Sequence, residues 1–369
     1  MDRDVVTSNH GAHRNMLVGM AGTFDIENYG DLLFPLIAAE ALQRRDPRIR
    51  VVPYALNGKS DPSWPFQVRP LEQLPASVSR LSAMLIGGGQ IVRFDKAYPV
   101  SVPTHVDVPI AYWLVPAVLA ATAGTPVIWN AVGVWTGSPR APWNDDLLCQ
   151  VFAASHFIGV RDRASRDHLA KLAPNAAIEL VPDTAFGVSR LWPLGAESAE
   201  FTAWRTALGV ASKYVVIQAS AAVATHRFRI QALVKSMGSM NAVILPVSWC
   251  HGDRAETFPE LEGRVFRSRT WLGPDLIREI VARSEFVFAS SLHVCITALS
   301  YGVPGARAPS FMDRKHELLD EFQSIAHIDN REALWRLVNR GRWVEPRALA
   351  ALDLADSDRK VVETLFGAP

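Results

Sequence analysis

Short apolar segments alternate with longer segments of helical periodicity along most of the chain. In the first half, the apolar segments typical of buried strands are residues 16–20, 49–54, 83–86, 126–131, 157–160 and 178–181. Segments with a helical pattern separate them, at residues 33–44, 110–122, 145–154 and 165–172. Strands of a parallel sheet are buried on both faces and are joined by helical crossovers. The pattern therefore predicts βαβ units and a parallel sheet.

The alternation resumes after residues 192–198, which we expect to form a surface linker. Strands are predicted at 214–218, 242–246 and 285–289, and helices at 229–237, 274–282, 292–301, 314–322 and within the amphipathic tail 331–366. The predicted fold class is α/β with two doubly wound parallel-sheet, Rossmann-like domains and a ligand cleft between them. The predicted boundaries are 1–190 for the N-terminal domain, 191–212 for the linker and 213–369 for the C-terminal domain with its helical tail.

Composition supports a large folded chain. The sequence has 369 residues, of which 49% are hydrophobic and 20% charged, which suits two domains rather than one core. The formal net charge of +1 argues against nucleic acid as the main partner. The polar segment 1–15 is expected to be a loose leader before the first strand.

Cysteine and histidine usage favours a cytoplasmic protein without a metal cofactor. The three cysteines are scattered and form no pair with metal-ligand spacing, so we expect reduced thiols.

The longest apolar stretch, 108–129, is interrupted by Pro116, Gly124 and Pro126, and its uninterrupted part is shorter than the ~20 residues that span a bilayer. A buried helix followed by a strand is the preferred interpretation, and peripheral contact with a membrane stays open.

The segment 288–304 carries the strongest functional signal. A strand runs into Ser290 and Ser291, then His293 and a helix of small residues that ends at 302–304. The two serines stand where an N-cap is expected, because their hydroxyls accept bonds from the first turn. His293 then lies at the positive end of the helix, where open α/β sheets bind anions. A structural histidine is the alternative.

Polar residues also follow the first strand. Gly30 is expected to permit a tight turn, and Asp31 to cap the next helix. In the functional interpretation, Glu27, Asn28 and Asp31 lie on the cleft floor, where they orient sugar hydroxyls or act as a base.

Further candidates follow later strands. Gly88 and Gly89 belong to a glycine run that admits a ligand or another backbone closely, although it is neither a P-loop nor a dinucleotide fingerprint. Arg161 lies at the carboxyl end of a strand and suits bidentate contact with carboxylate or phosphate. The alternative is a surface arginine paired with Asp162. Asp183 is expected to cap a turn or to face the cleft.

In the C-terminal half, residues 226–229, 248–253 and 314–316 hold groups suited to an anion or a sugar. Lys315 belongs to the last of these segments. Trp249 is either a platform for a sugar ring or a buried aromatic residue.

Taken in order, these motifs resemble the polysaccharide pyruvyl transferase family over about Met16 to Leu319. The residues that carry the resemblance are 28–31, 87–89, 160–165, 182–183 and 291–304. The resemblance implies a two-domain glycosyltransferase-B-like (GT-B) architecture with the acceptor on the N-terminal side and the donor on the C-terminal side. It also implies transfer of a pyruvyl group from phosphoenolpyruvate to a sugar, usually as a cyclic ketal.

The resemblance assigns Arg161 and His293 to donor binding or catalysis. One position departs from the family pattern, because many members have arginine where this chain has Ser291. Arg161, Arg307, Arg314 and Lys315 are candidates to replace the missing cation, or the donor differs.

The expected chemistry needs a proton at the donor's methylene carbon and attack of a sugar hydroxyl on C2. His293 serves as general acid or phosphate ligand, Arg161 pairs with the donor, and Asp31 or Glu27 accepts the hydroxyl proton. No cofactor is expected beyond phosphoenolpyruvate as donor substrate, and the acceptor is a glycan, with a lipid-linked sugar left open. Two alternatives stand: a nucleotide-sugar glycosyltransferase of the same architecture, and a noncatalytic sugar- or anion-binding protein.

Overall fold

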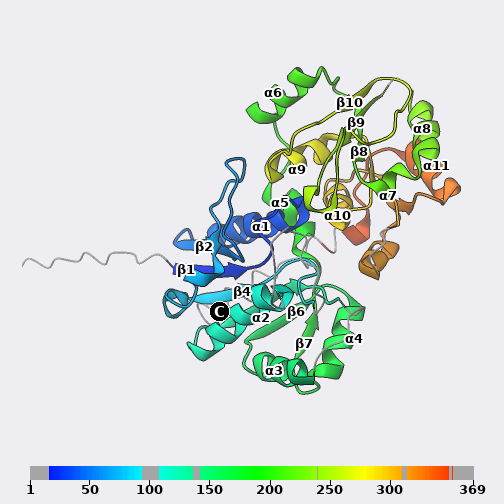
Figure 1. Ribbon diagram of the computed structural model, residues 1–369. Helices are drawn as coiled ribbons and strands as arrows, with labels where there is room; N and C mark the ends of the chain where they lie inside the picture. Colours follow the sequence, from blue (N-terminus) through cyan, green and yellow to red (C-terminus); the bar gives the residue numbers. More distant parts are fainter. Residues whose placement is uncertain are drawn as a thin grey trace, which may run out of the picture.

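The computed structural model describes residues 16–93, 108–135, 142–238, 240–309, 314–348 and 351, arranged around two parallel sheets (Figure 1). The expected leader 1–15 and the tail 352–369 lie outside these residues. Two α/β halves with helices on the sheet faces confirm the predicted fold class.

The first sheet has seven parallel strands in the order β3-β2-β1-β4-β5-β6-β7. Its strands are β1 (Met16–Ala21), β2 (Ile49–Ala55), β3 (Arg69–Pro70), β4 (Ala83–Ile86), β5 (Val127–Val132), β6 (Phe157–Val160) and β7 (Ile178–Leu180). The strand order reverses between β1 and β4, and such a reversal opens a crevice at the carboxyl ends of the strands.

Helices join these strands: α1 (Tyr29–Arg45), α2 (Val108–Thr122), α3 (Pro142–Ala153) and α4 (Arg163–Leu172), with short 3₁₀ turns η1 (Leu71–Gln73) and η2 (Val78–Arg80). Asp162 caps α4, because its carboxylate accepts a bond of 2.7 Å from the Ser165 N–H. After β7 come η3 (Thr184–Gly187), α5 (Val188–Leu191) and α6 (Ala199–Leu208). Helix α6 thus occupies part of the segment expected to be linker.

The second sheet has six parallel strands in the order β10-β9-β8-β11-β12-β13. They are β8 (Tyr214–Gln218), β9 (Asn241–Leu245), β10 (Val265–Arg267), β11 (Phe286–Ala289), β12 (Gly305–Arg307) and β13 (Ile325–His327). The helices are α7 (Ala221–Ala224), α8 (Arg227–Ser236), α9 (Pro274–Arg283), α10 (Leu292–Ser300) and α11 (Arg331–Arg340), with 3₁₀ turns η4 (Trp249–His251) and η5 (Arg314–Glu321). This order also reverses, between β8 and β11.

Four short strands were not predicted. Strands β3, β10, β12 and β13 have two or three residues each, too few for a period-two pattern. The predicted helix 314–322 is a 3₁₀ segment instead.

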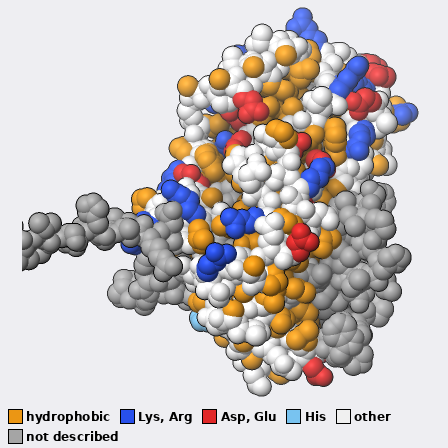
Figure 2. Space-filling view, turned by 60° about the vertical axis from the view of Figure 1, so that its left-hand side comes forward, with side chains coloured by type: hydrophobic (Ala, Val, Ile, Leu, Met, Phe, Trp, Pro, Cys, Tyr) orange, Lys and Arg blue, Asp and Glu red, His pale blue; other side chains and the backbone are white. Residues whose placement is uncertain are grey.

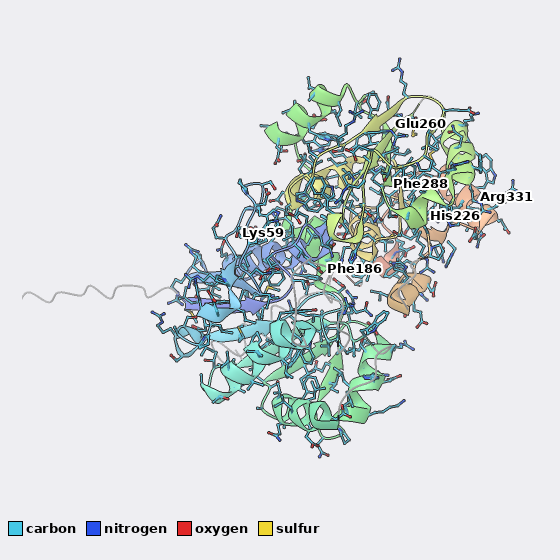
Figure 3. The ribbon with its side chains drawn as sticks, viewed as in Figure 1. Lys59, Phe186, His226, Glu260, Phe288 and Arg331 are labelled. Atoms are coloured by element: carbon cyan, nitrogen blue, oxygen red, sulfur yellow. The ribbon has the colours of Figure 1, made fainter. Side chains whose placement is uncertain are left out.

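The two halves share a hydrophobic core. Tyr29, Leu33 and Ile37 of α1 are buried in one cluster with residues of α9 and α10. The Tyr29 hydroxyl bonds the Thr297 hydroxyl at 2.7 Å. Figure 3 places Phe186 of η3 between the halves, and its ring stacks on Phe322. The junction is therefore a packed interior as well as the site of a cleft.

The surface in Figure 2 has basic and acidic side chains interspersed, which fits the small net charge of +1. Among the described residues, no helix combines the length and apolar character needed to cross a bilayer.

Candidate active site

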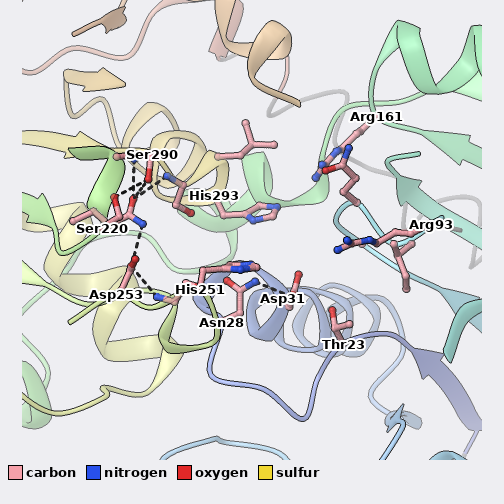
Figure 4. Close-up of a pocket in the computed structure, with 18 of the residues that line it drawn as sticks. Thr23, Asn28, Asp31, Arg93, Arg161, Ser220, His251, Asp253, Ser290 and His293 are labelled. Carbon is pink, nitrogen blue, oxygen red and sulfur yellow. Dashed lines mark hydrogen bonds between the residues drawn. The ribbon is translucent and has the colours of Figure 1, made fainter. Parts of the chain in front are cut away.

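A cavity of about 340 Å³ lies between the two halves at the carboxyl ends of their central strands (Figure 4). Its lining comes from the segments that follow β1, β4, β6, β8, β9 and β11. The two strand-order reversals therefore open toward one shared space, the position expected for a ligand site in doubly wound folds. The lining residues used below are Asn28, Asp31, Gly88, Arg93, Arg161, Gln218, Ser220, Ser248, His251, Asp253, Ser290, Ser291 and His293.

Three side chains from distant segments, Arg161, Asp183 and His293, lie next to one another at this cavity. Nη1 of Arg161 donates to Oδ2 of Asp183 at 2.9 Å. Nε2 of His293 lies 3.6 Å from the same Oδ2, beyond normal hydrogen-bond range, and has no bond to any other described residue. Arg161 and His293 line the cavity, whereas Asp183 is fully buried behind them.

Asp183 is ionised by its surroundings. Burial alone would raise the pKa of its carboxyl group, but His293, the charge of Arg161 and the N–H of Ala185 together hold the pKa at about 2. The Ala185 N–H donates to Oδ1 at 3.0 Å, so Asp183 also caps η3 as predicted. The carboxylate thus fixes the Arg161 guanidinium at the cavity.

Gly30 makes room for His293. A Cβ at position 30 would lie 1.9 Å from Nδ1 of His293, so only glycine allows the ring to pack on α1. Gly30 is inside the helix, and the predicted tight turn there is wrong. Phe34, one turn further along α1, meets the His293 ring edge-on with centroids 5.1 Å apart. The ring is thereby held between α1 and Asp183.

The glycine run after β4 has a backbone that other residues avoid. Gly87, Gly88 and Gly89 have φ of +87°, +100° and +77°. A Cβ on Gly88 would meet the Phe34 ring at 2.2 Å. Gly88 lines the cavity, and Gly89 stands beside Asp31, whose Oδ1 would lie 3.2 Å from a Cβ there. The run thus lets the cavity wall approach α1.

On the C-terminal side, Gln218 organises the turn before α10. Its Oε1 accepts bonds of 2.8 Å from the N–H groups of Ser290 and Ser291. Its Nε2 donates to Oδ2 of Asp253 at 3.0 Å, and that carboxylate also accepts the Val247 and Ser248 N–H groups. Burial is the main reason that the pKa of Asp253 is raised. Gln218 thus occupies two N–H groups that an anion would otherwise use.

The predicted serine caps are wrong in detail. Ser291 is the N-cap residue of α10, but its hydroxyl makes no capping bond within the described structure. The Ser290 hydroxyl bonds the Ser220 hydroxyl at 2.8 Å instead. Both serines line the cavity.

The acidic residues after β1 differ in placement. Asn28 is the N-cap of α1, so Asp31 lies in the first turn and does not cap the helix. Nδ2 of Asn28 donates to Oδ2 of Asp31 at 2.9 Å, and both side chains line the cavity. Glu27 does not line the cavity and forms an ion pair with Lys59 at 2.9 Å.

The candidate replacement cations are only partly at the site. Arg307 is buried away from the cavity, where it pairs with Asp320 and the His316 carbonyl. The side chains of Arg314 and Lys315 lie outside the described part of the structure. One face of the Trp249 ring is covered by the Arg254 guanidinium, 4.7 Å from the ring centre, so a sugar cannot stack on that face.

Sequence reasoning missed Arg93, Gln218 and Ser220. Gln218 ends β8 and Ser220 follows it as the N-cap of α7, and a polar residue at the end of an apolar strand is a usable signal for a cleft. Arg93 follows an irregular loop, and its position depends on the bridge between Val92 and Val134, which no local pattern reveals. Among the described residues, no cluster of His, Cys, Asp and Glu has a metal-binding arrangement.

Solved structures with the same arrangement act on sugars. The UDP-GlcNAc 2-epimerase from Neisseria meningitidis, solved with UDP-GlcNAc, superimposes with a TM-score of 0.54 at 13% identity, over 96% of this chain and 100% of that one. The UDP-GlcNAc 2-epimerase from Methanocaldococcus jannaschii gives 0.53 at 11% identity, over 88% and 92%. The spinosyn forosaminyltransferase SpnP gives 0.51 at 12% identity, over 95% of each chain. The likeness defines the fold as GT-B-like.

Residues 28–306 match the family model for polysaccharide pyruvyl transferase, and the chain belongs to this family. It is therefore a transferase. No curated protein shows significant sequence similarity to it. The family match spans both halves of the cavity, from the start of α1 to β12.

Proposed function

We propose that this protein transfers the pyruvyl group of phosphoenolpyruvate onto the hydroxyls of a sugar and forms a ketal. The observation that carries the proposal is the chain Arg161–Asp183–His293 at the cavity wall. It places a fixed cation and a proton-carrying group side by side where a ligand has access from both halves.

Arg161 suits the donor's anionic groups. Phosphoenolpyruvate carries a carboxylate and a phosphate, and the planar arginine fork matches both. Asp183 holds Arg161 through Nη1, so the guanidinium keeps one orientation at the cavity. This rigidity favours a single pose of the donor.

His293 is the proposed general acid. A histidine side chain can donate a proton to a reacting group, and Nε2 of His293 lies at the cavity, 3.6 Å from the buried carboxylate of Asp183. The proton goes to the methylene carbon, and the electrons of the C2–C3 double bond form the new C–H bond. C2 becomes electron-deficient, and a sugar hydroxyl attacks it.

Asp31 is the proposed acceptor of that hydroxyl's proton, since its carboxylate lines the cavity and is oriented by Asn28. A second hydroxyl of the same sugar then bonds to C2 as the C2–O bond to phosphate breaks. Its proton leaves with the phosphate or returns to His293. The products are the ketal and inorganic phosphate, so atoms and charge balance.

The test measures phosphate release from phosphoenolpyruvate by the full-length protein with a panel of sugars and lipid-linked sugars. Sugar-dependent release is expected, and His293→Ala should lower kcat by about 100-fold or more, the usual contribution of general acid catalysis. Arg161→Ala should abolish release. His327→Ala and Arg336→Ala, at exposed positions, should retain it.

Other outcomes would change the assignment. Transfer from UDP-GlcNAc, with none from phosphoenolpyruvate, would make this a nucleotide-sugar glycosyltransferase; the solved UDP-GlcNAc 2-epimerases share its fold. Binding of phosphoenolpyruvate without release on any sugar, and unaffected by His293→Ala, would support a noncatalytic binding protein.

A further inference from the structure

The proposed donor carries more negative charge than Arg161 alone can balance at the site. A phosphate monoester alone carries about −1.5 to −2 near neutral pH, and the donor adds a carboxylate. Arg161 is already balanced by Asp183 at 2.9 Å. Ser291, where the resemblance leads us to expect an arginine, carries no charge. The site therefore needs another cation.

The N-terminus of α10 does not supply the missing charge by itself. Gln218 takes the Ser290 and Ser291 N–H groups. Behind Gln218 stands the carboxylate of Asp253, which also lines the cavity. Apart from His251 and His293, this wall therefore presents hydroxyls and a carboxylate, a surface that suits neutral sugar hydroxyls better than a dianion.

Arg93 lies on the opposite wall. Figure 4 shows its guanidinium and that of Arg161 directed into the same part of the cavity, facing His293 and Asp31. Arg93 comes from the segment after β4, so two different strands of the first sheet each deliver one arginine.

The backbone of Arg93 is fixed in place. Val92 forms a bridge with Val134, and the Trp135 N–H donates to the Val92 carbonyl at 2.8 Å. Nε1 of Trp113 donates to the Arg93 carbonyl at 3.2 Å. The Arg93 guanidinium also lies 5.8 Å from the centre of the Trp135 ring, a cation–π distance. The charge is thus held at the cavity by its neighbours.

We propose that Arg93 is the second donor-binding cation and takes the part of the arginine missing at Ser291. Arg93 and Arg161 together hold the carboxylate and phosphate of phosphoenolpyruvate on the N-terminal wall. The hydroxyl-lined C-terminal wall is left for the acceptor sugar. This arrangement reverses the expectation of an acceptor on the N-terminal side and a donor on the C-terminal side. The inference rests on the proposed function.

The test titrates phosphoenolpyruvate into the full-length protein by calorimetry, which needs no known acceptor. Arg93→Gln should weaken binding by about 10- to 100-fold, the range expected for a lost charge-assisted bond. The affinity of Arg93→Lys for phosphoenolpyruvate should lie between those of the wild type and Arg93→Gln, because lysine keeps the charge but lacks the planar guanidinium. Arg336→Gln, on the exposed face of α11, is the control and should bind as the wild type does. Circular dichroism checks that each variant is folded.

A rescue variant separates ligand binding from a structural effect. Ser291→Arg in the Arg93→Gln background should restore part of the lost affinity, because it returns a cation to the cavity. Once an acceptor is known, Arg93→Gln should raise KM for phosphoenolpyruvate far more than it lowers kcat.

The two hypotheses fail differently. A wild-type protein that does not bind phosphoenolpyruvate would refute the proposed donor. Normal binding by the wild type, together with unchanged binding by Arg93→Gln, would refute the role of Arg93 and leave the proposed function standing.

Discussion

The buried carboxylate of Asp183 contacts both Arg161 and His293, the two side chains proposed to bind and protonate the donor. Its pKa is lowered to about 2 because His293, Arg161 and the Ala185 N–H outweigh the effect of burial. A carboxyl group whose pKa falls on folding stabilises the folded state above its unfolded pKa of roughly 3.9. That contribution is lost as the pH falls through the folded value.

Asp183→Asn should therefore destabilise the protein at neutral pH, by roughly 3–5 kcal/mol, because the buried Arg161 loses its hydrogen-bonded carboxylate and keeps only that of Asp162, 3.9 Å away. The difference in unfolding free energy from the wild type should shrink between about pH 4 and pH 2. Urea unfolding across this range measures it, with exposed Asp167→Asn as control. A difference that stays constant with pH would contradict the assignment.

Gly30→Ala tests the fit of His293. The added Cβ would lie 1.9 Å from Nδ1, so the ring must move away from α1. We expect a loss of about 1–3 kcal/mol from overpacking and a fall in phosphate release comparable to that of His293→Ala. Gly195→Ala, where no atom lies within 4 Å of the new Cβ, should change neither. Full activity of Gly30→Ala would show that the contact is unimportant.

At the scale of single residues, the sequence predicted those site residues that directly follow an apolar strand. Arg161 and His293 follow apolar strands, and both line the cavity. The role of Gly30 was missed because it depends on a residue from the other half of the chain. The placement of Arg93 was missed because it depends on a pairing that is distant in sequence, the bridge between Val92 and Val134.

At the scale of elements, the turn between β11 and α10 is held from outside. Gln218 of β8 bonds the N–H groups of Ser290 and Ser291, and Asp253 fixes the orientation of the Gln218 amide. The helix start is thus set by the neighbouring strand rather than by its own cap.

Gln218→Leu should leave these N–H groups and the Asp253 carboxylate without their partner. An unsatisfied buried polar group costs about 1–3 kcal/mol, so the midpoint of thermal unfolding should fall clearly. Weaker sugar binding should accompany the fall, as measured by calorimetry once an acceptor is known. Gln150→Leu, at an exposed position of α3, is the control. An unchanged midpoint would mean that water replaces the amide.

Strands and helices were predicted where the hydrophobic pattern along the chain is clear, and they were missed where it is short. Fully buried strands such as β4, β6 and β8 were predicted at their observed bounds. Strands β12 and β13 were missed, because their pairing with neighbours and not their own residues makes them strands.

At the scale of the whole molecule, α1 joins the halves. It connects strands of the first sheet, yet Tyr29, Leu33 and Ile37 pack in the core of the second half. The backbone adds to this, since the Tyr29 N–H donates to the Val247 carbonyl and the Trp249 N–H to the Glu27 carbonyl, each at 2.9 Å.

The halves should therefore unfold together. In calorimetry we expect one transition whose calorimetric and van't Hoff enthalpies agree. Tyr29→Phe removes the bond to Thr297. This variant should unfold at a lower temperature, and its van't Hoff enthalpy should fall below its calorimetric enthalpy. Tyr54→Phe removes a similar bond to Ser77 inside the first half, and should lower the midpoint alone. Two resolved transitions in the wild type would refute the coupling.

The contact between Gly30 and His293 limits how such proteins exchange parts. The proposed acid is encoded in the second half of the chain, while the space for its ring is encoded near the start. A chimera that keeps the second half of this chain and takes its first half from a relative separates His293 from the helix surface that fits it. Recombination within the family should succeed only where the start of α1 and the start of α10 travel together, although some 260 residues separate them in sequence.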